Sequence, residues 1–228
     1  MKILRILANW LFILCLPILL LTASLAWAVN SLNLYESGLQ KYGAAATTGL
    51  PESELNKIAA GLISYFNSNE AYIKVTAVKD GKTFEPFNQR EIAHLRDVKG
   101  LIWLDYRVLS GTLLYTLGYA LVNLLARRYR RLALAAVGGS GLTIALALVV
   151  GLAALLNEGA FADFFLQFHL LSFANDLWLL DPGDYLIMMF PQGFWYDAAR
   201  ACFIVTVIMA VILSVSAGWY IWFSRRKS

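Results

Sequence analysis

Charged residues are scarce in this chain. Asp, Glu, Lys and Arg make up 15% of its 228 residues, whereas 59% of the residues are hydrophobic. In soluble domains about a quarter of the residues are charged, so the composition excludes an ordinary soluble globular protein. Four apolar stretches, over residues 10–28, 101–125, 132–156 and 201–223, are each long enough to cross the ~30 Å hydrocarbon core of a membrane as a helix.

Acidic residues are missing from one side of the membrane that these helices would define. The segment before Trp10, the link 126–131 and the tail after Phe223 would share that side, and their charged residues are all basic. These residues are Lys2, Arg5, Arg127, Arg128, Arg130, Arg131, Arg225, Arg226 and Lys227. All 15 Asp and Glu and both histidines fall on the other side or at its membrane boundary. Because basic flanks stay in the cytoplasm, we predict cytoplasmic termini and outward-facing carboxylate or imidazole chemistry.

The predicted fold class is a mainly α membrane protein with four transmembrane helices, a small extracytoplasmic α+β domain and an interfacial or re-entrant helix. In chain order we expect transmembrane helix 1 over 1–28, an extracytoplasmic α+β segment over 29–100, transmembrane helix 2 over 101–125, a cytoplasmic basic loop over 126–131, transmembrane helix 3 over 132–156, an extracytoplasmic interfacial segment over 157–200, transmembrane helix 4 over 201–223 and a cytoplasmic basic tail over 224–228. The first helix also resembles a cleavable secretory signal, but its length and Trp27 favour a retained signal anchor. The basic loop is interpreted as a topology anchor, and no nucleic-acid partner is indicated.

Cysteine is rare as well, with Cys15 and Cys202 as the only two. They lie near opposite ends of their predicted helices, at depths that differ by roughly 20 Å, which excludes a disulfide. Phosphate-binding and dinucleotide-binding motifs are absent, and the run 138–142 (GGSGL) fails the serine-hydrolase pattern GxSxG at its last position. We therefore expect no cofactor.

The first outward segment has the pattern of a small α+β domain. Proline and acids over 51–54 predict a helix start, and the alternation over 71–78 predicts a strand. Asp80-Gly81 predicts a hairpin turn into a second strand near 83–87. Helical spacing returns at Gln89 and continues into the second membrane helix.

The second outward segment contains an apolar stretch over 161–180 that also holds polar residues such as Asp163 and Asn175. A fifth spanning helix there would put the basic C-terminal tail outside. We therefore predict an interfacial or re-entrant helix that Asp181-Pro182 ends.

The two histidines are the best candidates for chemistry. His94 has Glu91 and Asp97 three residues to either side, and on a helix both carboxylates would lie on its face, where they could fix the tautomer of a general base. The competing interpretation is a surface histidine on a solvated helix. His169 lies among aromatic and aliphatic residues, with Ser172 and Asp176 one and two turns further along the predicted helix. A buried histidine satisfied by a backbone carbonyl is the competing interpretation there.

Two other uses of these residues stay open. Glu91, His94, Asp97 and His169 together could form a metal site, although no HExxH spacing supports one and we expect none. The membrane-boundary charges, Asp105, Arg107 and Arg200, could extend to the interface, or the two arginines could hold a lipid carbonyl or an acidic group.

Two motifs resemble the lipoprotein intramolecular transacylase family. They are the segment 91–99 (EIAHLRDVK) ahead of a membrane helix, and the segment 168–178 (FHLLSFANDLW) followed by Asp181-Pro182 and Phe190-Pro191. The resemblance implies a four-helix protein of the bacterial cytoplasmic membrane with outward-facing segments. It also implies transfer of an acyl chain in a diacylglyceryl lipoprotein, from the sn-2 ester of its glycerol to the amino group of its N-terminal cysteine.

In that family two histidines are implicated in catalysis, and by motif they match His94 and His169. We expect His94 to be the base, oriented by Glu91 or Asp97. We expect His169 to be the acid or the oxyanion stabiliser, supported by Asp176 and Ser172. Arg107, Trp178 and Arg200 are candidate substrate-binding residues. The alternatives are a non-catalytic scaffold or sensor that binds lipid or protein, and a metal-dependent membrane hydrolase.

Overall fold

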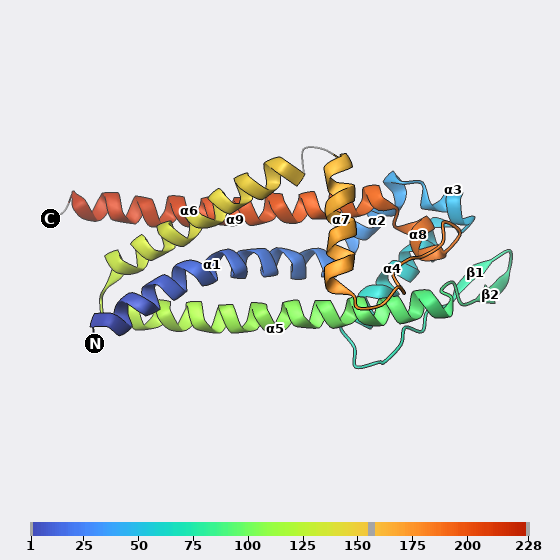
Figure 1. Cartoon of the computed structure of the whole chain (residues 1–228), viewed down its shortest axis with the longest axis horizontal. Helices are drawn as coiled ribbons and strands as arrows, with labels where there is room; N and C mark the ends of the chain where they lie inside the picture. The colour runs from blue at the N-terminus through green and yellow to red at the C-terminus, as the bar shows by residue number, and fades with distance from the viewer. Residues whose placement is uncertain (1, 155–157, 227–228) are drawn as a thin grey trace. The chain divides into compact units, whose positions relative to one another are not determined.

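The computed structural model describes residues 2–154 and 158–226, and most of them are helical (Figure 1). The elements in chain order are α1 (Lys2–Asn30), α2 (Leu32–Lys41), α3 (Ala44–Thr48), α4 (Glu52–Phe66), β1 (Ala77–Lys79), β2 (Lys82–Phe84), α5 (Gln89–Leu125), α6 (Tyr129–Ala154), α7 (Glu158–Ser172), α8 (Tyr185–Met189) and α9 (Gln192–Arg225). The predicted segment ends that fall on residues 1, 155–157 and 227–228 lie outside the described residues.

Four described helices, α1, α5, α6 and α9, are long and apolar enough to cross a membrane, which confirms the predicted fold class. Helix α5 has 37 residues and is about 55 Å long at about 1.5 Å per residue, well beyond the ~30 Å hydrocarbon core. Five of its seven charged residues lie over 89–100, and the other two, Asp105 and Arg107, lie near the start of the apolar stretch that begins at Leu101. The first turns of α5, including His94, therefore lie outside the apolar stretch.

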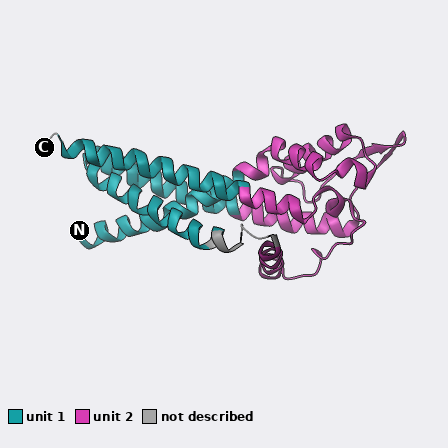
Figure 2. Cartoon of the chain, turned by 90° about the horizontal axis from the view of Figure 1, so that it is seen from above, with its two compact units in different colours: residues 1–26, 105–153, 201–228 teal, residues 27–104, 154–200 magenta. Residues whose placement is uncertain are grey.

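The chain divides into two compact units (Figure 2). The first, which we call the membrane unit, consists of 1–26, 105–153 and 201–228. The second, which we call the site unit, consists of 27–104 and 154–200. Both histidines belong to the site unit.

Small residues bring the helices of the membrane unit together. Its core cluster consists of Phe12, Leu16, Leu20, Tyr119, Ala135 and Ala210. A Cβ added at Gly139 would lie 2.8 Å from a methyl carbon of Leu16, so only glycine permits this approach. A Cβ added at Gly151 would lie even closer to the ring of Phe203, at 2.1 Å. Such contacts are typical of helices that pack within lipid.

Helix α4 and the β-hairpin form much of the site unit. Helix α4 begins at Glu52 after Pro51, as predicted, with Glu52 and Glu54 in its first turn. The hairpin is also confirmed, with its second strand over Lys82–Phe84 in place of the predicted 83–87. Strand β1 pairs antiparallel with β2, and both turn residues have positive φ, 52° at Asp80 and 73° at Gly81. That is the backbone of a type I′ turn.

The predicted strand over 71–78 is wrong for residues 71–76, which form no ladder. The alternation of apolar and polar residues reflects burial of one side of the segment: Ile73 and Ala77 are buried, while the residues next to them in the chain are exposed. Val75, between them, packs against Gly61 of α4. The segment is extended against α4, without a partner strand.

The predicted helix over 161–180 is correct only to Ser172, where α7 ends. Beyond it, the side-chain oxygen of Asn175 accepts a hydrogen bond from the Leu177 backbone N–H at 3.0 Å. Asn and Asp favour such turns over helix, because their side chains bond to nearby backbone groups. We call residues 173–184 the strap; it joins α7 to α8 without a helix or a strand.

Candidate functional site

The first turn of α5 is fixed by a capping box. The Asn88 side-chain oxygen accepts hydrogen bonds from the backbone N–H of Arg90 (2.9 Å) and Glu91 (3.0 Å). Glu91 returns the contact, since its Oε2 accepts one from the Asn88 N–H at 2.7 Å. These bonds set the start of the helix that carries His94 one turn later.

Glu91 does not orient His94, contrary to the sequence-based expectation. Its second oxygen, Oε1, accepts a hydrogen bond from the backbone N–H of Leu186 at 2.7 Å. Both oxygens are thus used by backbone donors, and the side chain is 1% exposed. Glu91 therefore links the start of α5 to the start of α8, and its role is structural.

The ring of His169 is held by its own helix. Its Nδ1 lies 2.7 Å from the carbonyl oxygen of Phe165, one turn earlier in α7. Because a carbonyl only accepts, Nδ1 carries the hydrogen and Nε2 carries the lone pair in the neutral ring. The backbone partner of a buried histidine is therefore present, but it satisfies only one of the two nitrogens.

The structure brings the two histidines together. Their ring centroids lie 6.1 Å apart with an interplanar angle of 29°. His94 is 7% exposed and His169 is 8% exposed, so neither is a solvated surface residue. The Nδ1 atom of His94 is buried without a hydrogen-bond partner among the described residues. A buried polar atom left unpaired is costly, which suits a group that meets its partner when substrate binds.

Aromatic rings surround His169. Ring centroids of Phe165, Trp178, Phe168 and Phe173 lie 4.4, 5.1, 5.4 and 5.6 Å from that of His169. Phe173 also lies 5.2 Å from His94 and so touches both imidazoles. The pair therefore lies in an apolar aromatic environment.

Burial keeps both imidazoles neutral. Burial, and then the neighbouring His169, lower the pKa of His94 to about 4, while the charge of Asp97 acts in the opposite direction. Burial also lowers the pKa of His169, and the hydrogen bond to Phe165 opposes this change. Both rings are thus available as neutral bases or hydrogen-bond donors at neutral pH.

The other predicted supporting residues have different positions from those expected. Asp97 acts on His94 only through space, and its Oδ2 accepts a hydrogen bond from the Asn175 amide at 2.9 Å. Ser172 is the last residue of α7 and is half-buried. Asp176 lies beyond that helix end and is exposed, so the prediction of a shared helical face with His169 is wrong for it.

Among the three candidate substrate-binding residues, Trp178 lies next to the histidine pair, in contact with His169. Arg107 belongs to the membrane unit and is exposed. Arg200, also exposed, interacts electrostatically with Asp197. Substrate contacts of all three stay predictions.

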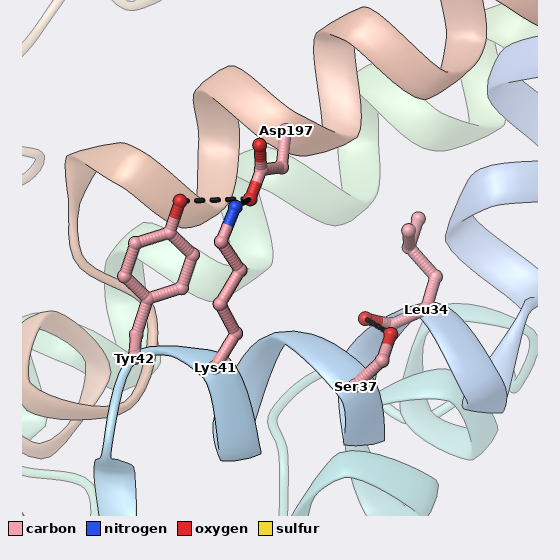
Figure 3. A network of polar contacts seen from close by, with 5 residues as sticks. All are labelled: Leu34, Ser37, Lys41, Tyr42 and Asp197. Atoms are coloured by element: carbon pink, nitrogen blue, oxygen red, sulfur yellow. Dashed lines mark hydrogen bonds and ion pairs between the residues drawn. The ribbon is translucent and has the colours of Figure 1, made fainter.

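Asp197 joins α9 to the end of α2, as Figure 3 shows. Its Oδ2 accepts hydrogen bonds from Lys41 Nζ at 2.6 Å and from the Tyr42 hydroxyl at 2.7 Å. Gly193 makes room for the Tyr42 ring, because a Cβ there would lie 2.5 Å from it. Arg200 therefore belongs to a polar cluster that ties two helices of the site unit together.

A metal site does not form from the four residues that could have built one. Within 2–154 and 158–226 no group of three or more His, Cys, Asp or Glu side chains is arranged to hold an ion. Glu91 in particular has both oxygens engaged by backbone N–H groups.

Sequence reasoning missed the residues that hold the strap. Arg90 donates a hydrogen bond to the Asp176 carbonyl at 2.6 Å, and the Asn88 amide donates one to Asp184 Oδ1 at 2.7 Å. With the Asn175–Asp97 bond, they join the strap to the first turns of α5. The available signal was polar: Asn175 and Asp176 interrupt an apolar stretch, and Asn88 is a good N-cap.

Fold and site together define a multi-pass helical membrane protein with a buried histidine pair. A sequence model of the family described as lipoprotein intramolecular transacylase Lit matches residues 10–195. The chain belongs to this family, and it is an acyltransferase.

Solved structures agree with the fold. The membrane-integral lipoprotein intramolecular transacylase Lit from Bacillus cereus is 18% identical, with a TM-score of 0.77 and coverage of 100% of both chains. A variant of that protein with a histidine replaced by alanine gives 19% identity and a TM-score of 0.78, covering 100% of this chain and 97% of the other. A histidine-to-arginine variant gives 18% and 0.79, covering 100% and 96%. No curated protein matches the chain significantly.

Proposed function

We propose that this protein moves the sn-2 acyl chain of a diacylglyceryl lipoprotein to the α-amino group of the lipoprotein's N-terminal cysteine, with His94 and His169 as the catalytic residues. The observation that carries the proposal is the pair itself. Two buried imidazoles lie 6.1 Å apart between ring centroids, and one has an unpartnered nitrogen. The name of the solved Bacillus cereus protein supplies the substrate class.

The reaction needs one proton to move and no net acid or base. The amine nitrogen attacks the ester carbonyl carbon, the bond from that carbon to the glycerol oxygen breaks, and an amide and a free glycerol hydroxyl result. The unperturbed pKa of an α-amino group is about 7.7–8.0, so a useful fraction is neutral at physiological pH. The attacking nitrogen loses a proton, and the departing glycerol oxygen gains one.

Hydrogen bonding supports His169 as the group that carries this proton, which reverses the roles expected from the sequence. The Phe165 carbonyl fixes Nδ1–H, so the Nε2 lone pair is the site that accepts a proton. The imidazolium that then forms keeps this hydrogen bond and lies among aromatic rings, which stabilise a cation. It gives the proton to the glycerol oxygen.

His94 supports the same step as a neutral donor. Its pKa of about 4 leaves too little imidazolium at neutral pH for it to act as a charged acid. A neutral imidazole can still donate one N–H to the ester carbonyl oxygen as negative charge develops there. Its unpartnered Nδ1 shows that the ring has hydrogen-bonding capacity to spare for substrate.

Charge and composition support the location. The acidic residues and both histidines fall on the side opposite the basic flanks, so we place the site at the outer leaflet of the bacterial cytoplasmic membrane. Arg107 and Arg200 are proposed contacts for carbonyl or acidic groups of the substrate. An intramolecular transfer needs no acyl-enzyme, since nucleophile and ester belong to one molecule.

The test is mass spectrometry of a lipoprotein N-terminus after co-expression in a strain that lacks N-acylation. Wild-type protein should produce an N-acyl, monoacyl-glyceryl cysteine. His94→Ala and His169→Ala should each lower its amount about 100-fold or more, the usual size of an acid–base contribution. Membrane levels of each variant are measured in the same cells. A diacylglyceryl cysteine with a free amine, from cells that contain folded wild-type protein, would contradict the proposal.

A further inference from the structure

Two nucleophiles compete for the ester at the histidine pair. The substrate amine gives the amide, whereas water gives a free fatty acid and leaves the cysteine amine free. A base that accepts a proton from an amine can also accept one from water, so the chemistry of the pair alone does not choose between them. The choice depends on how well the site excludes water.

Of the four aromatic side chains next to His169, Trp178 is the most distant from α7 in the sequence. Phe165 and Phe168 belong to α7, and Phe173 follows directly after its last residue. Trp178 comes from the strap, where its ring lies 5.1 Å from that of His169 at an interplanar angle of 40°. Its position therefore depends on how the strap is held.

The strap is held on both sides of Trp178 by the first turns of α5. Before it, Arg90 donates to the Asp176 carbonyl and Asn175 donates to Asp97. After it, the amide of Asn88, the residue ahead of α5, donates to Asp184 Oδ1 at 2.7 Å. Within the strap, the Leu179 N–H donates to the Asp176 carbonyl at 3.1 Å, and the Leu180 N–H to the Trp178 carbonyl at 3.0 Å. These bonds fix the backbone that presents the indole.

From this arrangement we infer that Trp178 is a positioning and specificity-determining residue. It is held over His169 by the strap to exclude water, and so it sets the ratio of acyl transfer to hydrolysis. The inference rests on the proposed function. Hydrolysis balances with water as the co-reactant: water oxygen bonds to the carbonyl carbon, the glycerol oxygen leaves and takes the proton, and a fatty acid is released.

The experiment uses the purified full-length protein in vesicles of phosphatidylethanolamine and phosphatidylglycerol. The substrate is a synthetic diacylglyceryl lipopeptide with an isotopically labelled sn-2 chain, and mass spectrometry counts labelled N-acyl peptide and labelled free fatty acid. For Trp178→Ala we expect the ratio of transfer to hydrolysis to fall roughly tenfold, which corresponds to about 1.4 kcal/mol between the two barriers. Trp178→Phe should restore most of the ratio, because a smaller ring still covers the imidazole.

The strap contact has a matched pair of variants. Arg90→Ala removes the bond to Asp176 and should lower the ratio in the same direction, less than Trp178→Ala does. Arg90→Lys, which can still donate, should restore it. Leu179→Ala, at an exposed neighbouring side chain, is the control and should leave the ratio unchanged. If Trp178→Ala does not fold, the Arg90 pair decides.

Loss of transfer in Trp178→Ala without added fatty acid would overturn the inference, as would an equal change in Leu179→Ala. Arg90→Ala with an unchanged product ratio would do so as well. Failure of the proposed function has a different result: wild-type protein would make no labelled N-acyl peptide at all.

Discussion

The membrane unit and the site unit are packed on different principles. In the site unit, the largest side chains with less than 2% exposure include Leu50, Leu55, Ile58, Leu62 and Met189. In the membrane unit those at this level of burial are small, such as Ser24, Ser140 and Ala210. Large apolar side chains there are exposed instead, for example Leu114 at 76%. Lipid is as apolar as leucine, so the helices of the membrane unit gain from close contact with one another rather than from removing apolar surface from water.

Polar side chains differ between the units in the same way. In the membrane unit many bond to their own helix one turn back, as Thr116 does to the Thr112 carbonyl at 2.8 Å. In the site unit they join distant segments, as Glu91 does with Leu186. The site geometry therefore depends on long-range polar contacts such as this one.

The largest expected effect is on the acyl-transfer activity of the histidine variants, with little effect on their stability. His94→Ala and His169→Ala should reduce transfer by about 10²–10⁴-fold. Each should lower the thermal stability of the purified protein only modestly, because the cost of the cavity is partly offset by removing the cost of burying an imidazole. Thermal unfolding in detergent beside the activity assay checks this. A loss of activity explained by unfolding would contradict it.

A cavity should be costly in one unit and nearly harmless in the other. Leu55→Ala, in the site unit, should reduce the free energy of unfolding by about 2–5 kcal/mol. Leu114→Ala removes the same atoms from an exposed position of the membrane unit and should have little effect. Thermal unfolding of the two variants compares them directly, and equal losses would break the distinction between the units.

The structural role of Glu91 can be tested by comparison with another glutamate in the first turn of a helix. Glu91→Ala leaves the Asn88 and Leu186 N–H groups without partners, at about 1–3 kcal/mol each. Glu52→Ala, at an exposed position in the first turn of α4, is the control and should cost less than 1 kcal/mol, about the value of one helix-dipole contact. Chemical unfolding measures both, and a Glu91→Ala variant as stable as the control would show that its two contacts carry no weight.

Acid should destabilise the site unit through its histidines. The pKa of His94 is about 4 in the folded protein, below the ordinary value of 6.5. Below pH 6.5 the unfolded chain takes up a proton that the folded chain does not, so stability is complete above that pH and is lost as the pH falls towards 4. His94→Gln should flatten this dependence. Wild-type stability that rises between pH 6.5 and pH 4 would contradict the burial argument.

The smallest effect is expected at a polar contact in the membrane unit. The hydroxyls of Ser24 and Thr206 lie 2.8 Å apart in a buried contact. Thr206→Val removes it and should cost about 0.6 kcal/mol, the average for such bonds in membranes. Unfolding measurements on Thr206→Val are compared with Thr112→Val, at a half-buried position whose hydroxyl bonds only within its own helix. A cost for Thr206→Val well above ~0.6 kcal/mol would contradict the expectation.

The sequence predicted what depends on local rules. Apolar length gave the four membrane helices, and Asp80-Gly81 gave the hairpin, because both signals lie in consecutive residues. The two histidines were found because imidazole is rare in the chain and each lay in an informative setting. The structure adds that the two rings lie together, with their centroids 6.1 Å apart.

The remainder depends on contacts between distant residues. The spacing predicted that Glu91 lies on the same helical face as His94. In the structure its carboxylate accepts a hydrogen bond from the Leu186 backbone N–H, a contact that no pattern in the neighbouring sequence indicates. The helix over 161–180 was extended too far because apolar content outweighed Asn175. Helices α2 and α3 were not predicted, since their positions depend on packing against α4 and α8.

The most direct test of the central claim is a crossover measurement on the purified protein. Two diacylglyceryl lipopeptides of different peptide mass, only one with a labelled sn-2 chain, are mixed in vesicles with the protein, and their N-termini are analysed. We predict labelled amide only on the peptide that carried the labelled ester, and none with the His94→Ala, His169→Ala double variant. Label on the other peptide, or labelled amide formed by the double variant, would contradict an intramolecular transfer at this histidine pair.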